Sequence, residues 1–294
     1  MIAPRLLGAT RLFVPPLGFG AGGIADPATP EADVARLLGG ALDLGLSLID
    51  TARSYGLSEE RIGRHLGGRR KEFVLSTKVG YGVPGVPDWT GTAVASGIDA
   101  ALARLRTDVI DVVHLHSCPL DVLRNGGVVE PLLRAVVAGK VRVAAYSGDN
   151  APLAWAASEG PFGSLQTSVN LYDQSALESA VPAAAVRGIG VIAKRALGNA
   201  PWRFASRPGG DEAEPYWDRM ATMRLPDFGL PPEELAIRFS AFAPGVATAL
   251  VASRSAGHLR ALAAAVAKGP LPEDVVMKIR AAFRLHGASW EGRI

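Results

Sequence analysis

The chain has 294 residues and a net charge of +3, and hydrophobic residues make up 48% of it. This composition is typical of a folded protein with a large core and argues against intrinsic disorder. Lysine and arginine are spread along the chain, so no nucleic-acid-binding surface is indicated. No apolar run approaches the ~18 residues that span a bilayer, and the N-terminus lacks a secretory signal pattern. We therefore expect a cytoplasmic protein that does not contact membranes.

The single cysteine, Cys118, excludes an intrachain disulfide, and no cysteine cluster is available to bind a metal. We expect Cys118 to be a packed residue rather than a nucleophile. No linker or low-complexity tract divides the chain, so residues 1–294 are predicted to form one domain. An oligomeric state does not follow from these patterns.

Short runs rich in Val, Ile and Leu recur about every 20 to 40 residues, and each is followed by an amphipathic stretch, as expected of βα units. These runs lie at Leu17–Gly20, Leu46–Asp50, Phe73–Lys78, Val109–His116, Val141–Ser147, Ser164–Asn170, Gly190–Lys194 and Thr248–Ala252. Eight such units predict an α/β fold of the (β/α)8 TIM barrel type. The segment RLLGATRLFVPP before the first run predicts a small β-hairpin that closes the barrel bottom.

Two helix starts carry recognisable capping chemistry. Thr29 precedes Pro30 and Glu31, and Ser58 precedes two glutamates. A hydroxyl ahead of a proline or of acidic first-turn residues is typical of a helix N-terminus. We therefore expect helices to begin at these points, with Thr29 and Ser58 as capping residues.

Polar residues end most of the apolar runs. They are Asp50, Lys78, His116, Ser147, Asn170 and the pair Lys194-Arg195. In an α/β barrel, chemistry lies at the carboxyl ends of the strands. A single acid or base at such a place is usually structural, but packing alone does not require an acid, an amine and an imidazole to meet at one rim. Tyr55 follows Asp50 by five residues and lies within reach of the same rim.

The stretch GLSLIDTARSYGLSEERIG resembles the aldo/keto reductase family. The similarity continues in order through FVLSTKVG, DVIDVVHLHSCP, GKVRVAAYSG, LQTSVNLYD and ASRSAGHL, and covers about residues 5 to 265. The resemblance implies a catalytic tetrad at Asp50, Tyr55, Lys78 and His116. It also implies an oxidoreductase that moves a hydride between a nicotinamide and a carbonyl or alcohol substrate. We expect strand alternation to point the competing His114 away from the side that His116 faces.

The chemistry of such a tetrad follows from its residue types. A tyrosine holds its proton at neutral pH and releases it reluctantly, so Tyr55 needs assistance to act as an acid. An ammonium at Lys78 stabilises the phenolate, and Asp50 keeps that ammonium charged and in place. His116 donates a hydrogen bond to the substrate oxygen and helps to stabilise its developing charge. This chemistry requires no metal.

The resemblance also implies how the cofactor is held. Ser147 and Gln166 are expected to bind the nicotinamide carboxamide, with Asn170 as a third contact. The family commonly has asparagine where this chain has Gly148, so one amide partner is missing unless Asp149 or Asn150 replaces it. Lys194, with Arg195 beside it, stands where many members stack a tyrosine on the nicotinamide. Lys194 either packs its methylenes on the ring or reaches a phosphate.

The segment after the last strand resembles the family's loop around the adenosine 2′-phosphate. Arg254 offers a planar donor fork for that phosphate and Ser253 a further donor. These residues favour NADPH, with NADH as the alternative cofactor.

Two other functions compete with this interpretation. A nucleotide-binding regulatory subunit of the same fold would bind the cofactor with little turnover. A lyase would use Lys78 as a Schiff base and ignore nicotinamide. The intact tetrad argues against both. The stretch from about Leu197 to Pro231 is where we expect substrate selection to take place.

Overall fold

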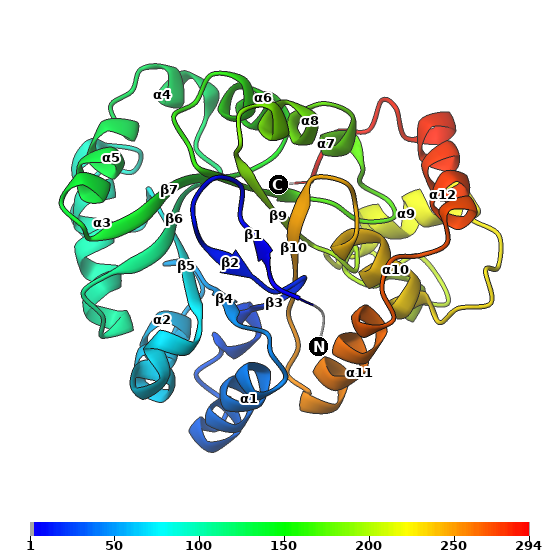
Figure 1. The fold of residues 1–294 in the computed structure, drawn as a ribbon, viewed down its shortest axis with the longest axis horizontal. Coiled ribbons are helices and arrows are strands. Elements are labelled where there is room, and N and C mark those ends of the chain that lie inside the picture. The colour runs from blue at the N-terminus through cyan, green and yellow to red at the C-terminus, as the bar shows by residue number, and fades with distance from the viewer. Residues whose placement is uncertain (1–2, 294) are drawn as a thin grey trace.

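The computed structural model describes residues 3–293, in which eight parallel strands close into a barrel. Around the barrel the strand order is β10, β3, β4, β5, β6, β7, β8, β9, and every neighbouring pair is parallel. The barrel strands are β3 (Leu17–Gly20), β4 (Leu48–Asp50), β5 (Val74–Val79), β6 (Ile110–His116), β7 (Val141–Ser147), β8 (Ser164–Ser168), β9 (Gly190–Lys194) and β10 (Val246–Val251). Figure 1 shows these strands at the centre and the helices outside them.

Helices follow the strands and cover the outside of the barrel (Figure 1). The α-helices are α1 (Glu31–Asp43), α2 (Ser58–Leu66), α3 (Gly91–Leu105), α4 (Leu120–Arg124), α5 (Val129–Val137), α6 (Asn150–Ser158), α7 (Ser175–Glu178), α8 (Ala180–Val186), α9 (Glu214–Met223), α10 (Pro232–Ala241), α11 (Ala256–Ala267) and α12 (Glu273–His286). Three short 3-10 helices are η1 (Ala21–Ile24), η2 (Gly67–Glu72) and η3 (Pro201–Arg203). None of the described helices combines the length and apolar character needed to cross a membrane.

The predicted TIM barrel is confirmed, and each of the eight predicted runs overlaps one barrel strand. Seven of the sixteen strand ends differ from the prediction by one or two residues, as is common where a strand passes into a loop. The largest consequence concerns Asn170, which was predicted to end a strand. β8 ends at Ser168, and Asn170 instead pairs with Asp173 in a tight turn.

The predicted N-terminal hairpin is also confirmed. β1 (Arg5–Leu6) and β2 (Phe13–Val14) form an antiparallel pair that crosses the middle of the barrel in Figure 1. Leu7 is fully buried, and the Arg5 guanidinium donates to the carbonyl of Val246, where β10 begins. The hairpin therefore closes the amino ends of the strands and leaves the carboxyl ends free for chemistry.

Both predicted helix starts are near their places, but the predicted caps are wrong. α1 begins at Glu31 after Pro30, and no side chain caps it, so Thr29 stands one position too early. Ser58 is the first residue of α2. Its hydroxyl donates to the Ala21 carbonyl and accepts from the Thr51 hydroxyl, so it connects α2 to η1 and to the loop after β4 instead of capping its own helix. A local capping motif cannot predict such contacts, because they join segments that are distant in the sequence.

Candidate active site

A cavity of about 910 Å³ opens at the carboxyl ends of the strands. It is lined by all four predicted tetrad residues, Asp50, Tyr55, Lys78 and His116. These residues come from the ends of β4, β5 and β6 and from the loop after β4. The parallel topology therefore brings the four side chains together, as the sequence predicted.

Asp50 and Lys78 form a buried ion pair, with the Lys78 Nζ 2.5 Å from the Asp50 Oδ2. Lys78 is 2% exposed, and its ammonium also donates to the Thr51 carbonyl at 2.8 Å. Burial lowers the pKa of Lys78, but the negative charge of Asp50 and the nearby Tyr55 phenol more than offset this, so its pKa lies above the ordinary value. An ammonium has three donors, so one remains for the phenol.

Tyr55 is half-buried at the edge of the cavity, between the ion pair and His116. The Lys78 Nζ lies 5.0 Å from the centre of the Tyr55 ring, and the His116 ring centre lies 6.2 Å away in an edge-on arrangement. Burial, together with the charge of Lys78, lowers the pKa of His116 to about 2. His116 is therefore a neutral imidazole that donates or accepts hydrogen bonds but carries no charge.

The expectation for His114 is wrong. His114 and His116 are two residues apart, so strand alternation places both side chains on the same face. The His114 Nε2 lies 3.1 Å from the Ser76 hydroxyl, which in turn donates to Asp50. Burial lowers the pKa of His114 to about 4, so it is a neutral support beneath the tetrad.

Ser147 and Gln166 lie beside the tetrad and are connected to it. The Ser147 hydroxyl donates to the Gln166 Oε1, and the Gln166 Nε2 donates to the Asp50 Oδ1. Both side chains line the cavity. The serine oxygen keeps acceptor capacity and the glutamine keeps one amide hydrogen. This donor and acceptor set matches the complementary groups of a nicotinamide carboxamide.

Lys194 and Arg195 both line the cavity, at the end of β9 and just after it. The Lys194 Nζ lies 2.8 Å from the Asp149 Oδ2. Burial lowers the pKa of Lys194 and the Asp149 charge opposes this effect. Asp149 is thus committed to Lys194 and to the Thr167 hydroxyl, while Asn150 bonds the backbone of Gly292.

The remaining predicted residues lie outside this cavity. The Asn170 Oδ1 accepts from the Tyr172 amide, so the side-chain acceptor of Asn170 is used inside a turn. Ser253 and Arg254 follow β10 on the rim, and the Ser253 hydroxyl is 3.1 Å from the His258 Nδ1. Arg254 lines a neighbouring cavity of about 470 Å³ together with Arg36. Both cavities border the start of α11, since His258 lines the first and Ala256 the second.

Comparison with known proteins places this geometry in a family. The model of the aldo/keto reductase family matches residues 16–284. The chain belongs to the aldo/keto reductase family. It is 34% identical to the 6-dehydroglucose reductase of Novosphingobium aromaticivorans, in a match covering 49% of this chain and 50% of that protein. It is also 34% identical to the aldo-keto reductase yakc [NADP(+)] of Schizosaccharomyces pombe, over 44% of this chain and 41% of that protein.

The matches to these curated relatives span about half of their length or less. A solved structure of an aldo-keto reductase from Bacillus halodurans, in its holo form, covers 98% of both chains with a TM-score of 0.84. At 24% identity, this likeness shows the shared fold. The aldo/keto reductase fold therefore extends over nearly the whole chain.

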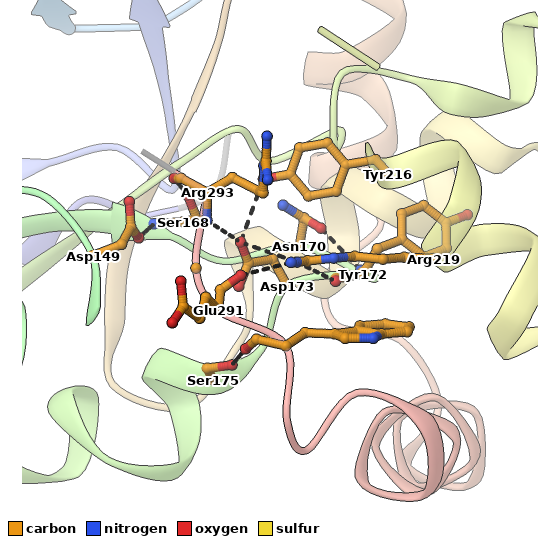
Figure 2. Close-up of polar contacts among 12 residues, drawn as sticks. Asp149, Ser168, Asn170, Tyr172, Asp173, Ser175, Tyr216, Arg219, Glu291 and Arg293 are labelled. Carbon is orange, nitrogen blue, oxygen red and sulfur yellow. Dashed lines mark hydrogen bonds and ion pairs between the residues drawn. The ribbon is translucent and has the colours of Figure 1, made fainter. Parts of the chain in front are cut away.

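In this aldo/keto reductase the C-terminal segment folds back towards the cavity, which the sequence did not indicate. Figure 2 shows Asp173 meeting Tyr216, Arg219 and the Arg293 backbone. The Asp173 Oδ2 accepts from the Arg293 amide at 3.2 Å and from the Tyr216 hydroxyl at 3.4 Å. Arg195 donates to the Arg293 carbonyl at 2.7 Å. The end of the described chain is thus connected to a residue that lines the cavity.

Asp173 makes the stability of these contacts with the C-terminal segment dependent on pH. Burial and the nearby charge of Asp149 raise the pKa of Asp173 from its ordinary value of 3.8 to about 6. Between these values the folded protein binds a proton that the unfolded chain does not hold. Asp173 therefore contributes stability that is fully present below its ordinary pKa and is lost as the pH rises through about 6.

We expect Asp173→Asn to remove this pH dependence. The amide does not titrate, so the free energy of unfolding of the variant should gain about 1 kcal/mol relative to wild type between pH 5 and pH 7, where wild-type Asp173 gives up its proton. Urea unfolding of both proteins across that range measures the difference. A difference that stays constant with pH would contradict the assignment.

Proposed function

We propose that this chain is an NADPH-dependent oxidoreductase that transfers a hydride between the nicotinamide and an aldehyde or ketone, or in reverse from an alcohol or sugar. The observation that carries the proposal is the meeting of Asp50, Tyr55, Lys78 and His116 in one cavity at the carboxyl ends of the barrel strands. In the proposal the whole chain acts as one catalytic domain.

The four side chains divide the work of carbonyl reduction. Bound NADPH would supply the hydride that the carbonyl carbon accepts. As the C=O bond opens, its electron pair moves to the oxygen, which takes the Tyr55 proton. Lys78 stabilises the phenolate left behind, and Asp50 holds Lys78 charged in a site where burial alone would favour the neutral amine. His116 donates a hydrogen bond to the same oxygen.

Other residues of the cavity fit a dinucleotide. In the proposal Ser147 and Gln166 hold the carboxamide, and Lys194 and Arg195 lie along the path of the phosphates, because they are the cations of the β9 end of the cavity. Asn170 is not among the proposed carboxamide contacts, because its side-chain oxygen already accepts a hydrogen bond within its own turn. Lysine and arginine side chains supply the charge-assisted hydrogen bonds that phosphate oxygens accept.

The preference for NADPH over NADH rests on Ser253 and Arg254. Arg254 lines the smaller cavity beside the start of α11, and one of the relatives carries NADP(+) in its name. A guanidinium there suits the 2′-phosphate that distinguishes the two cofactors.

We expect Arg254→Ala to weaken NADPH binding about tenfold or more and to leave NADH binding within about twofold, because one charge-assisted contact is lost only for the phosphorylated cofactor. Fluorescence titration with each cofactor measures both affinities. Arg134→Ala, which removes an exposed arginine of α5, is the matched control. Equal weakening of both cofactors, or tighter NADH binding by wild type, would refute the NADPH assignment.

The substrate end of the cavity is polar. Asn199, Arg203 and Asp211 line it, and all three belong to the stretch after β9 in which we expected substrate selection. These polar side chains, together with the similarity to a 6-dehydroglucose reductase, favour a hydroxyl-rich carbonyl compound such as a sugar as the substrate.

The function is tested by assaying the protein with NADPH and NADH against 4-nitrobenzaldehyde and a panel of aldoses, ketoses and sugar lactols, in both directions. We expect cofactor-dependent turnover with at least one of them. Cofactor binding without turnover would support the alternative of a regulatory subunit and overturn the enzyme proposal. A borohydride-trappable adduct on Lys78 would instead support a lyase.

A further inference from the structure

His116 is held by a second tyrosine that the sequence did not single out. Tyr81 lies on the loop after β5, and its hydroxyl is 2.8 Å from the His116 Nδ1. The two rings are stacked, with centres 5.4 Å apart and planes 26° apart. The Tyr81 hydroxyl also lies 3.3 Å from the Ser54 hydroxyl, one residue before Tyr55. Tyr81 thus bridges the loop that carries the acid and the strand that carries the imidazole.

The loop itself fixes where Tyr81 stands. The Trp89 ring packs against Tyr81 with centres 5.5 Å apart, and the Trp89 amide donates to the Gly80 carbonyl at 2.7 Å. Gly80 has a φ of +131°, and a Cβ there would lie 2.3 Å from the indole ring. Only glycine permits this close approach, which brings the Trp89 ring against Tyr81. An Asp88 carboxylate that accepts from the Gly82 amide closes the same turn.

The direction of this hydrogen bond is coupled to the nitrogen of His116 that carries the proton. A neutral imidazole has one N–H, and His116 is neutral because burial and the cations facing it, Lys78, Lys194 and Arg195, disfavour a second proton. If the Tyr81 hydroxyl donates to Nδ1, the proton lies on Nε2. Among the described residues, the His116 ring bonds only through Nδ1, so Nε2 is left for the cavity.

The opposite tautomer would work against the reaction. With the proton on Nδ1, Tyr81 would accept it and donate to Ser54, and Nε2 would present a lone pair to the substrate. A lone pair repels a carbonyl oxygen and cannot stabilise the charge that builds up on it. We propose that Tyr81 is a positioning residue that holds His116 in its Nε2–H form, ready to donate to the substrate oxygen. The inference rests on the proposed function, because the reaction decides between the two tautomers, but the nitrogen shifts test the tautomer without any substrate.

The test is Tyr81→Phe, which keeps the stacked ring and removes only the hydroxyl. With 15N-labelled histidine, the chemical shifts of the two ring nitrogens report the tautomer directly, and His116→Gln assigns its signals among those of the five histidines. We expect an Nε2–H imidazole in wild type and a mixture of tautomers in Tyr81→Phe. With the best carbonyl substrate, kcat/KM should fall in proportion to the fraction of His116 that leaves the Nε2–H form, about twofold for an equal mixture. NADPH affinity should not change.

Tyr146→Phe is the matched control, because its hydroxyl bonds the Cys118 carbonyl at 3.3 Å and is absent from the cavity lining. It should leave the tautomer and turnover as in wild type. An Nδ1–H imidazole in wild type, or an unchanged tautomer in Tyr81→Phe, would overturn the proposal. A wild-type protein without turnover would defeat the proposed function alone, since the nitrogen shifts are read without substrate.

Discussion

Replacement of Tyr55 by phenylalanine is expected to lower kcat for carbonyl reduction by about 10²- to 10⁴-fold, the usual contribution of a positioned acid. The phenol lies at the cavity edge beside both the Lys78 ammonium and His116. The phenylalanine ring keeps the packing, so NADPH affinity should stay close to that of wild type. Steady-state kinetics and a fluorescence titration measure the two quantities on the same preparation.

Tyr172→Phe is a suitable control for this experiment. Tyr172 is buried among core residues and is absent from the cavity lining, so loss of its hydroxyl should leave kcat unchanged. If Tyr55→Phe retains wild-type turnover on a substrate that wild type reduces well, another group supplies the proton and the assignment of the acid is wrong.

The second large effect is expected from Lys78→Met. Lys78 and Asp50 are both almost fully buried, and removal of the ammonium leaves the carboxylate with only the Ser76 and Gln166 donors among the described side chains. Breaking a buried pair by deleting one partner typically costs about 3–5 kcal/mol, because the other charge stays buried without compensation. We expect that loss in the free energy of unfolding, together with loss of turnover as large as in Tyr55→Phe.

The double variant Asp50→Asn/Lys78→Met separates the two consequences. The asparagine that replaces Asp50 carries no charge, so most of the lost stability should return, whereas turnover should stay absent because nothing stabilises the phenolate. Urea unfolding and kinetics on the wild type, both single variants and the double variant complete a cycle. A double variant as unstable as Lys78→Met would show that the cost comes from packing rather than from the unpaired charge.

Much of this architecture could be predicted because its signals are local. Each barrel strand is an apolar run of only a few residues, and the polar residue that ends it lies at the carboxyl rim, where parallel strands collect their ends. Asp50, Lys78 and His116 were predicted in this way. The hairpin that begins at Arg5 was predicted because the apolar residues before the first strand must be buried against the barrel.

The features that sequence patterns missed depend on contacts between distant segments. The C-terminal segment docks through the carbonyls of Trp290, Glu291 and Arg293, and backbone groups leave no side-chain pattern. Tyr81 meets His116 only because Gly80 adopts a left-handed conformation that lets Trp89 fold over the loop. Ser58 resembled a cap but bonds across the barrel rim. Strand alternation, applied with its correct period, would have placed His114 beside His116.

The most direct test of the central claim follows the hydride itself. Wild-type protein is incubated with 4-nitrobenzaldehyde and with NADPH that carries deuterium at both positions of nicotinamide C4, and the alcohol product is examined by mass spectrometry and NMR. We predict one deuterium per product molecule, on the former carbonyl carbon, at a rate that Tyr55→Phe lowers by about a hundredfold or more. A protein that binds the labelled cofactor but transfers no deuterium to that carbon, with any carbonyl of the panel, would contradict the claim.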